Sequence, residues 1–256
     1  MRTHSTKAAL ITLIAAASMC FVFASSVQAQ SLQSGSSVKF QKAQEAVEHQ
    51  IIARQVQLAL LGTEVVNAAH LTTTDSSSLV GIITSEQTAL ETDASNAAAA
   101  TTYAELDAVQ KAVVADERVY AVVTDQVGLV IGADNDTVTE AGYTGLAAEL
   151  APMVAELGST HATQLLADIT SRVAAATSLT SGVSAEALAL TPAGYPGNES
   201  QIKTWTYQLG QVSKDLAIAK ADVKAIEAIA LNTHHIHILS PSRPPPLQPR
   251  RPPARS

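Results

Sequence analysis

Three histidines lie close together near the end of the chain, at His234, His235 and His237. Imidazole nitrogens bind Zn²⁺, Ni²⁺ or Cu²⁺, and a complete site needs about four donors. No Asp or Glu lies between Ala228 and Ser256 to supply the missing ligands. We therefore expect an incidental tail sequence here and no resident metal.

Oxygen-bearing side chains from Asp134 to Glu140 have the spacing of a calcium loop at first sight. Alternating carboxylates can converge on a hard cation, but an EF-hand requires glycine at its sixth position and a bidentate glutamate at its twelfth. Those positions hold Thr139 and Gly145. We predict instead that residues 133–136 end one helix and that the N-cap of the next helix follows them.

Hydrolytic chemistry has little support in the sequence. Neither a G-x-S-x-G nor an H-E-x-x-H motif occurs. His49, His70 and His161 each stand alone on a predicted helix or at its end, where a surface or capping role is expected. The sequence favours a protein that is not an enzyme and carries no cofactor.

Arg54 and Asp116 interrupt apolar helical stripes. Such residues can fix the register of a bundle, line a ligand site, reach out to water or pair with each other, and we expect a structural role. Trp205 and Tyr207, with Tyr195 in the preceding loop, are candidates for an aromatic clamp on a glycan or partner. Because Trp205 also falls on an apolar stripe, we expect it in the core.

Residues 1–29 have the three parts of a secretory signal peptide. Arg2 and Lys7 supply positive charge, residues 8–24 are apolar, and Val27-Gln28-Ala29 fits an A-x-A-like cleavage site. The sequence therefore predicts an exported protein with no membrane span after processing.

Cleavage after Ala29 would also remove Cys20, the single cysteine of the chain. The processed protein, beginning at Gln30, would then have no disulfide and no thiol chemistry. Lipid attachment at Cys20 is the alternative, which we disfavour because Ala17-Ser18-Met19 makes a poor lipobox.

The charge balance argues against nucleic acid as a partner. The chain has 16 basic and 23 acidic side chains and a formal net charge of -7. Residues 1–29 and 240–256 hold six of the basic side chains and no acidic one, so the part between them is more acidic still. Such a surface repels the phosphate backbone.

Apolar residues recur at helical spacing along most of this acidic part. In residues 38–70 they form two stripes, so we expect this helix to have neighbours on two sides. Capping boxes mark the starts of the next two helices: Thr72 with Asp75, and Thr101 or Thr102 with Glu105.

β-branched residues crowd the segment 119–131, where a hairpin turning at Thr124-Asp125 is the alternative to a helix. We favour the helix because the apolar phase set by residues 106–113 runs through the segment, whereas a strand needs a period of two.

The following elements are predicted from their boundary residues. A shorter helix is predicted over 142–157, kinked or interrupted at Pro152, and Gly158 ends it. A fifth helix follows, capped by Ser159 or Thr160 and loosening at Ser181-Gly182. After it come an N-cap at Thr191, directly before Pro192, and a turn at Pro196-Gly197-Asn198.

The last helix has the most regular pattern. Nine apolar residues are spaced alternately three and four apart: Ile202, Trp205, Leu209, Val212, Leu216, Ala219, Val223, Ile226 and Ala230. This predicts an amphipathic helix about 45 Å long at about 1.5 Å per residue. The apolar seam could face its own domain or a second copy.

Residues 233–256 form a tail that is first His-rich and then rich in Pro and Arg, with seven of the ten prolines in residues 240–256. This composition predicts an extended, disordered segment. If native, its arginines suit an anionic envelope polymer, acidic lipid headgroups or a proline-binding domain. A frame change in the coding sequence near Asn232 would produce the same abrupt shift.

Two segments give the chain a family resemblance. Residues 116–130 (DERVYAVVTDQVGLV) and 189–195 (ALTPAGY), followed by a closing helix over 215–230, resemble a group of uncharacterised secreted, alanine-rich helical proteins of Gram-positive bacteria. That resemblance implies an all-helical fold and export, and it implies no activity and no site residues.

Together these observations predict an all-α fold, an up-and-down bundle of five to six helices with coiled-coil-like packing. It would form one domain over residues 38–232 after a flexible lead at 30–37. We expect a secreted, non-enzymatic structural or interaction protein of the cell envelope or extracellular space, in which self-association is possible. A module that holds a small molecule or metal between its helices is the alternative.

Overall fold

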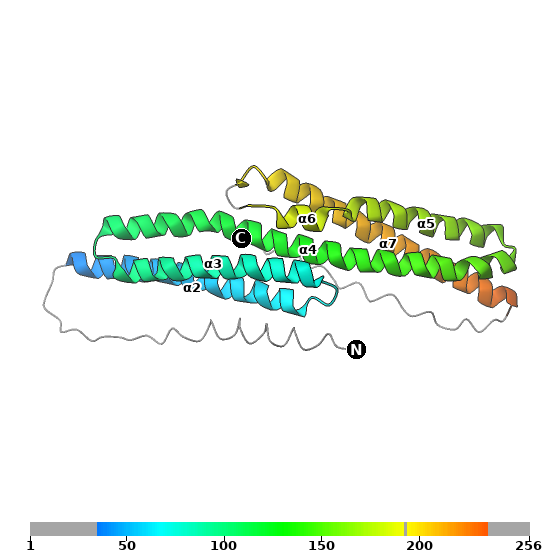
Figure 1. Cartoon of the computed structure of the whole chain (residues 1–256), viewed down its shortest axis with the longest axis horizontal. Helices are drawn as coiled ribbons and strands as arrows, with labels where there is room; N and C mark the ends of the chain where they lie inside the picture. The colour runs from blue at the N-terminus through cyan, green and yellow to red at the C-terminus, as the bar shows by residue number, and fades with distance from the viewer. Residues whose placement is uncertain (1–34, 192–193, 235–256) are drawn as a thin grey trace. The chain divides into compact units, whose positions relative to one another are not determined.

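The computed structural model describes residues 35–191 and 194–234, and within them the fold is all-helical. The helices are α2 (Gly35–Asn67), α3 (Thr73–Ala99), α4 (Tyr103–Leu157), α5 (Thr160–Thr180), α6 (Val183–Leu188) and α7 (Glu199–His234), drawn in Figure 1. The predicted fold class is confirmed. The predicted signal peptide, and the tail from residue 235 onward, lie outside the described residues. Because α2 begins at Gly35, residues 35–37 of the predicted lead are helical.

Contacts divide the chain into two compact units, which we describe one at a time. The first unit holds α2, α3, α4 up to Val127, and the segment Leu190–Gly197. The second holds α4 from Gly128 onward, α5, α6 and α7, together with the short segment Ala69–Thr72. A single α4 therefore contributes to both units.

In the first unit, α2 and α3 pack beside the first part of α4. The buried side chains are apolar and recur at helical spacing: Val47, Ile51, Leu58, Leu61 and Val65 of α2, Leu79, Ile83, Leu90 and Ala97 of α3, and Leu106, Val109, Val113, Val122, Val123 and Val127 of α4. Phe40 and Tyr103 meet edge to face, with ring centroids 5.2 Å apart. At the far end of this part of α4, the buried Gln126 donates Nε2–H to the Leu190 carbonyl at 2.9 Å.

The predicted capping box at the start of α4 is present. Glu105 Oε2 accepts from the backbone N–H groups of Thr101 and Thr102 at 2.7 and 3.0 Å. In return, the Glu105 N–H donates to Thr102 Oγ1 at 3.2 Å. These contacts satisfy N–H groups that the first helical turn leaves without intrahelical partners.

The central part of α4 corrects two predictions. Residues 119–131 are helical, as favoured, but the predicted helix end at 133–136 is wrong, and residues 142–157 are not a separate helix. The helix continues because the buried Asp134 finds hydrogen-bond donors on other elements. It also runs on through Pro152, which lies inside α4 and is exposed.

In the second unit, α5 and α7 pack against the second part of α4. The core cluster comprises Tyr143, Leu146, Leu150 and Val154 of α4, Ala162, Ile169, Val173 and Ala176 of α5, and Val212, Leu216, Ala219, Val223 and Ile226 of α7. All nine positions of the predicted α7 seam are buried. The seam therefore faces its own unit and is not available to a second copy.

Local residues set the ends of these helices. Gly158 takes a positive φ of 58° after α4, and the Ser159 side chain accepts from the Ala162 N–H to cap α5. Gly182, with φ of 82°, separates α5 from α6. Pro192, which follows the predicted N-cap Thr191, lies outside the described residues. The predicted turn at residues 196–198 is present, and α7 begins directly after it at Glu199.

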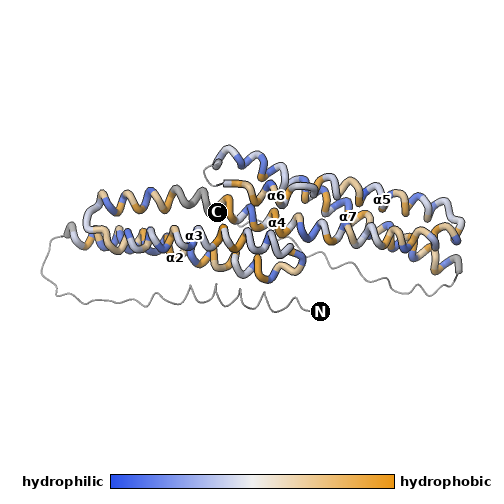
Figure 2. The backbone as a smooth tube through the Cα atoms, in the orientation of Figure 1, coloured by the Kyte–Doolittle hydropathy of each residue, from blue (hydrophilic) through white to orange (hydrophobic). Residues whose placement is uncertain are grey.

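Each helix alternates hydrophobic and hydrophilic residues along its length (Figure 2). Among the described residues, no helix combines the length and apolar character needed to span a bilayer.

Candidate functional site

Three carboxylates are buried on the α4 segment of the second unit. Asp134, Asp136 and Glu140 have exposed fractions of 7%, 4% and 5%. An unpaired carboxylate in such surroundings costs several kcal/mol, so each must be met by donors. The sequence indicated a helix end at residues 133–136 and the N-cap of the next helix after it, and it did not identify the three carboxylates as a buried group.

Asp134 joins three elements of the second unit. Its Oδ2 accepts from the backbone N–H of Thr72 at 2.8 Å, and its Oδ1 accepts from the Ser184 hydroxyl of α6 at 3.2 Å. Thr72 belongs to the α2–α3 connection. One side chain thus attaches this connection and α6 to α4.

Glu140 fastens the end of α5 to α4. The hydroxyl of the buried Thr180 donates to Glu140 Oε1 at 2.6 Å and also lies 3.1 Å from the Ala176 carbonyl. Thr180 is the last residue of α5, directly before the turn at Gly182. The contact therefore holds the α5–α6 junction in place.

These carboxylates act as hydrogen-bond acceptors and are not arranged as metal ligands. Within residues 35–191 and 194–234, no group of three or more His, Asp or Glu side chains is placed to hold a metal ion. Because residues 134–140 are helical, their side chains point in several directions around α4, unlike those of a calcium loop.

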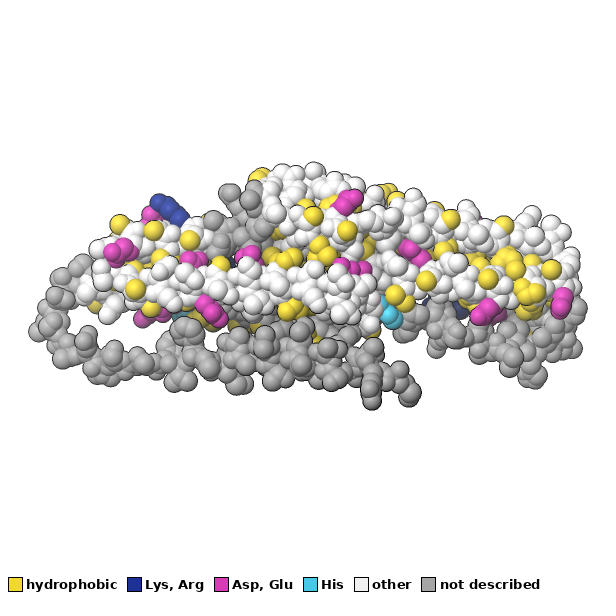
Figure 3. Space-filling view, in the orientation of Figure 1, with side chains coloured by type: hydrophobic (Ala, Val, Ile, Leu, Met, Phe, Trp, Pro, Cys, Tyr) yellow, Lys and Arg dark blue, Asp and Glu magenta, His cyan; other side chains and the backbone are white. Residues whose placement is uncertain are grey.

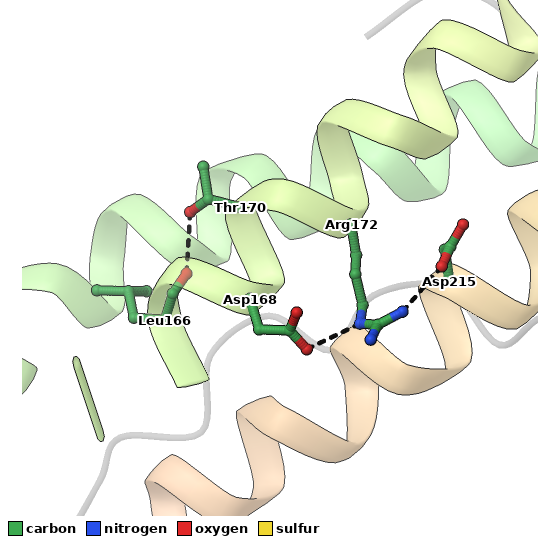
Figure 4. Close-up of polar contacts among 5 residues, drawn as sticks. All are labelled: Leu166, Asp168, Thr170, Arg172 and Asp215. Atoms are coloured by element: carbon green, nitrogen blue, oxygen red, sulfur yellow. Dashed lines mark hydrogen bonds and ion pairs between the residues drawn. The ribbon is translucent and has the colours of Figure 1, made fainter. Parts of the chain in front are cut away.

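A second polar cluster lies on the contact between α5 and α7 (Figure 4). Arg172 Nε donates to Asp168 Oδ2 at 2.8 Å, one helical turn earlier on α5. Arg172 Nη1 donates to Asp215 Oδ1 of α7 at 3.0 Å. The three side chains are partly exposed, with fractions of 29% for Arg172, 44% for Asp168 and 26% for Asp215.

The Arg172 guanidinium sets the electrostatics of this cluster. Its hydrogen bond lowers the pKa of Asp168 below the ordinary value, and the same contact raises the pKa of Arg172. Asp222 of α7 behaves in the opposite way, because burial and the neighbouring Asp168 raise its pKa. Its Oδ2 is buried and, among the described residues, has no hydrogen-bond donor.

The structure places the charged residues singled out from the sequence at separate points. Arg54 is 7% exposed and donates Nη1–H to the carbonyl of Val113, within the first unit, which fits the structural role expected for it. The side chain of Asp116 lies outside the described part. His49 and His161 are exposed on α2 and α5.

The aromatic candidates also separate. Trp205 is 5% exposed in the core, as expected, whereas Tyr207 is 68% exposed. His234 is the last residue of α7, and His235 and His237 lie outside the described residues.

One face of α2 is apolar but is not covered by any of the residues that the structure describes. Ile52, Val56 and Leu60, spaced four residues apart, have exposed fractions of 44%, 54% and 65%. Between His49 and Glu64, Arg54 is the only charged residue, and it is buried on the opposite side. Ile52 and Val56 belong to the second stripe predicted on α2, and Leu60 extends their row. The neighbour predicted on this side is absent among the described residues, and the row faces outward.

The exposed face of α3 is different in character. It is rich in hydroxyls and shows few charged side chains in Figure 3. Five of these hydroxyls donate to the carbonyl four residues earlier: Ser77, Ser78, Thr88, Thr92 and Ser95. Since these hydroxyls are satisfied within α3 itself, we find no ligand-binding geometry on this face.

Comparison with known proteins adds no relative to this picture. No family model, no curated protein and no solved structure matches the chain.

Proposed function

We propose that this chain is an exported, non-enzymatic helical protein that works by contacts through its helix faces. We further propose that it belongs with the secreted, alanine-rich helical proteins of Gram-positive bacteria that residues 116–130 and 189–195 resemble. One observation carries the proposal: α2 presents Ile52, Val56 and Leu60 to solvent on the side opposite its buried stripe.

Exposed apolar side chains in a row lower the free energy of a complex that covers them, by about 25 cal/mol per Å² removed from water. Three side chains along about 12 Å of helix are too few for a permanent dimer, which needs about 800 Å² per partner. The face suits a smaller, reversible contact with an amphipathic helix. Glu45, Glu48 and Glu64 of α2 lie beyond the ends of the patch and favour a partner with basic ends.

Export is tested by the mass of the protein after expression with its own leader in a Gram-positive host. We expect the intact mass of the material outside the cytoplasm to correspond to a chain that begins at Gln30. A product that begins at Met1 and stays in the cytoplasm would rule out the exported role.

Contact through α2 is tested by site-specific crosslinking. In the processed chain Val56→Cys would be the single thiol, because Cys20 falls in the predicted leader. A photoreactive label at this thiol should give a defined adduct on the producing cells, and the additional changes Ile52→Gln and Leu60→Gln should abolish it.

The matched control is Thr88→Cys, an exposed residue on the hydroxyl face of α3. We expect the same label at this position to give no adduct. Equal adducts from both positions, or an adduct that survives the Ile52 and Leu60 substitutions, would contradict a contact through the apolar face.

A further inference from the structure

The contact between α5 and α7 contains more carboxylates than cations. Arg172 is the only basic side chain among the four groups that interact there, which also include Asp168, Asp215 and Asp222. With all three acids ionised, the group would carry a net charge of -2. A neutral arrangement requires added protons or added cations.

The register of the two helices brings Asp222 next to Asp168. The helices α5 and α7 run in opposite directions (Figure 1), and Arg172 contacts Asp215. Asp168 lies one turn before Arg172 on α5, and Asp222 lies two turns after Asp215 on α7, so antiparallel packing directs both toward the same part of the contact. The two carboxyl groups interact there with each other.

One oxygen of the Asp222 carboxyl lacks a hydrogen-bond donor in the part of the chain that the structure describes. Its Oδ2 is buried and has no donor among the described residues, while its neighbour Asp168 already accepts from Arg172 Nε. Two carboxylates in contact repel each other when both are ionised, and a proton between them converts the repulsion into a hydrogen bond.

We propose that Asp168 and Asp222 share one proton taken from solvent, and that loss of this proton weakens the contact between α5 and α7, so that the second unit is stabilised as the pH falls. The charged groups that act on Asp222 are Asp168 and Arg172, both of α5; α4 contributes none, and the nearest charged residues on α7 itself, Lys220 and Lys224, are exposed. Arg172 keeps Asp168 ionised, so Asp222 holds the proton.

The sign of the effect follows from the direction of each shift. Burial and Asp168 raise the pKa of Asp222, so its contribution to folding is complete at low pH and is lost as the pH rises through the raised value. Asp168 has a lowered pKa and contributes in the opposite sense, with its stabilisation lost only in stronger acid. Between the two values the shared proton is in place.

The test compares the purified protein with its Asp222→Asn variant by thermal unfolding from pH 3.5 to pH 8. Asparagine imitates the protonated carboxyl, so the two melting temperatures should coincide at the acidic end. Above the raised pKa the variant should melt about 2 °C higher, because a partly exposed like-charge pair costs little. The matched control is Glu227→Gln, which removes a half-buried carboxylate of α7 outside the cluster. The difference in melting temperature between this variant and the unmodified protein should not depend on pH in the way expected for Asp222→Asn.

A measurement on the unmodified protein keeps the proposal independent of the variants. Carbon-13 NMR of the Asp carboxyls should show Asp168 and Asp222 titrating as a pair, with each resonance reporting both steps. Two independent single-step titrations at ordinary values, or an Asp222→Asn difference that stays constant with pH, would overturn the shared proton.

Discussion

At the level of single residues, Asp134 shows how a carboxylate is accommodated inside a helical core. It replaces water with the Thr72 N–H and the Ser184 hydroxyl, donors that lie 62 and 50 residues away in the chain. Hydrogen bonds to a charged acceptor are about twice as strong as neutral ones, which offsets the loss of hydration.

The Asp134→Asn substitution tests this account. The amide keeps one acceptor oxygen but directs an N–H₂ group at a donor, so one buried contact is lost. We expect the free energy of unfolding to fall by about 1–3 kcal/mol, measured by urea denaturation with circular dichroism.

The control for this change is Asp107→Asn. The Asp107 side chain is 58% exposed and pairs with the exposed Lys111 four residues later, so a loss of less than about 0.5 kcal/mol is expected. Equal losses from the two variants would mean that the buried contacts of Asp134 contribute nothing specific.

Residue-level reasoning from the sequence succeeded where a signal is local. The apolar seam of α7 and the Thr102–Glu105 capping box of α4 each depend on residues close together in the sequence. The structure shows the nine seam residues buried and the capping hydrogen bond formed. It failed at residues 133–136, because Asp-Asn-Asp is typical of a turn unless distant donors meet it. Glu140 and Asp136 continue the helical spacing of the buried residues Tyr143, Leu146 and Leu150. This spacing was the signal in the sequence that the two carboxylates would be buried.

At the level of elements, helix ends are set by backbone conformation. Alanine substitutions at two glycines should therefore change the stability of the protein in opposite directions. Gly182 has φ of 82°, and a Cβ there would lie 3.4 Å from Glu186 Oε1. Gly182→Ala should destabilise the protein by about 1 kcal/mol, since an L-residue is strained at positive φ. Gly210 lies within α7, and a Cβ there would meet nothing within 4 Å, so Gly210→Ala should stabilise it by about 0.5–1 kcal/mol. Thermal unfolding of both variants measures the two signs, and a shared sign would refute the backbone argument.

The capping box of α4 predicts a pH effect that is separate from that of Asp222. Hydrogen bonds from the backbone and hydroxyl of Thr101, and then from the Thr102 backbone, lower the pKa of Glu105 below 4.5. A lowered pKa gives stability that is present at neutral pH and lost as the pH falls through the lowered value. Glu105→Gln should therefore melt about 2 °C lower than the unmodified protein at pH 7, and this difference should disappear in acid as the pH falls through the lowered pKa. The control is Glu149→Gln, at an exposed position of the same helix. Its melting temperature should not show the loss at pH 7 that disappears in acid.

At the level of the whole molecule, charge governs whether the apolar face of α2 brings copies together. The chain carries a net charge of -7 at pH 7, and its isoelectric point is near 5.4. Repulsion between like-charged copies opposes weak apolar contacts at neutral pH and disappears as the net charge approaches zero.

Association of the full 256-residue chain should therefore rise as the pH approaches 5.4 and fall again at higher pH, as measured by light scattering over a range of concentrations. If the α2 face is responsible, the Ile52→Gln, Leu60→Gln double variant should scatter less than the unmodified protein at the same pH, because each change removes apolar area from the contact without altering charge. Tyr207→Gln is the control, since Tyr207 is 68% exposed but lies on α7, and it should leave the scattering unchanged. If all three proteins scatter alike near the isoelectric point, loss of net charge alone accounts for the association, and the α2 face has no part in it.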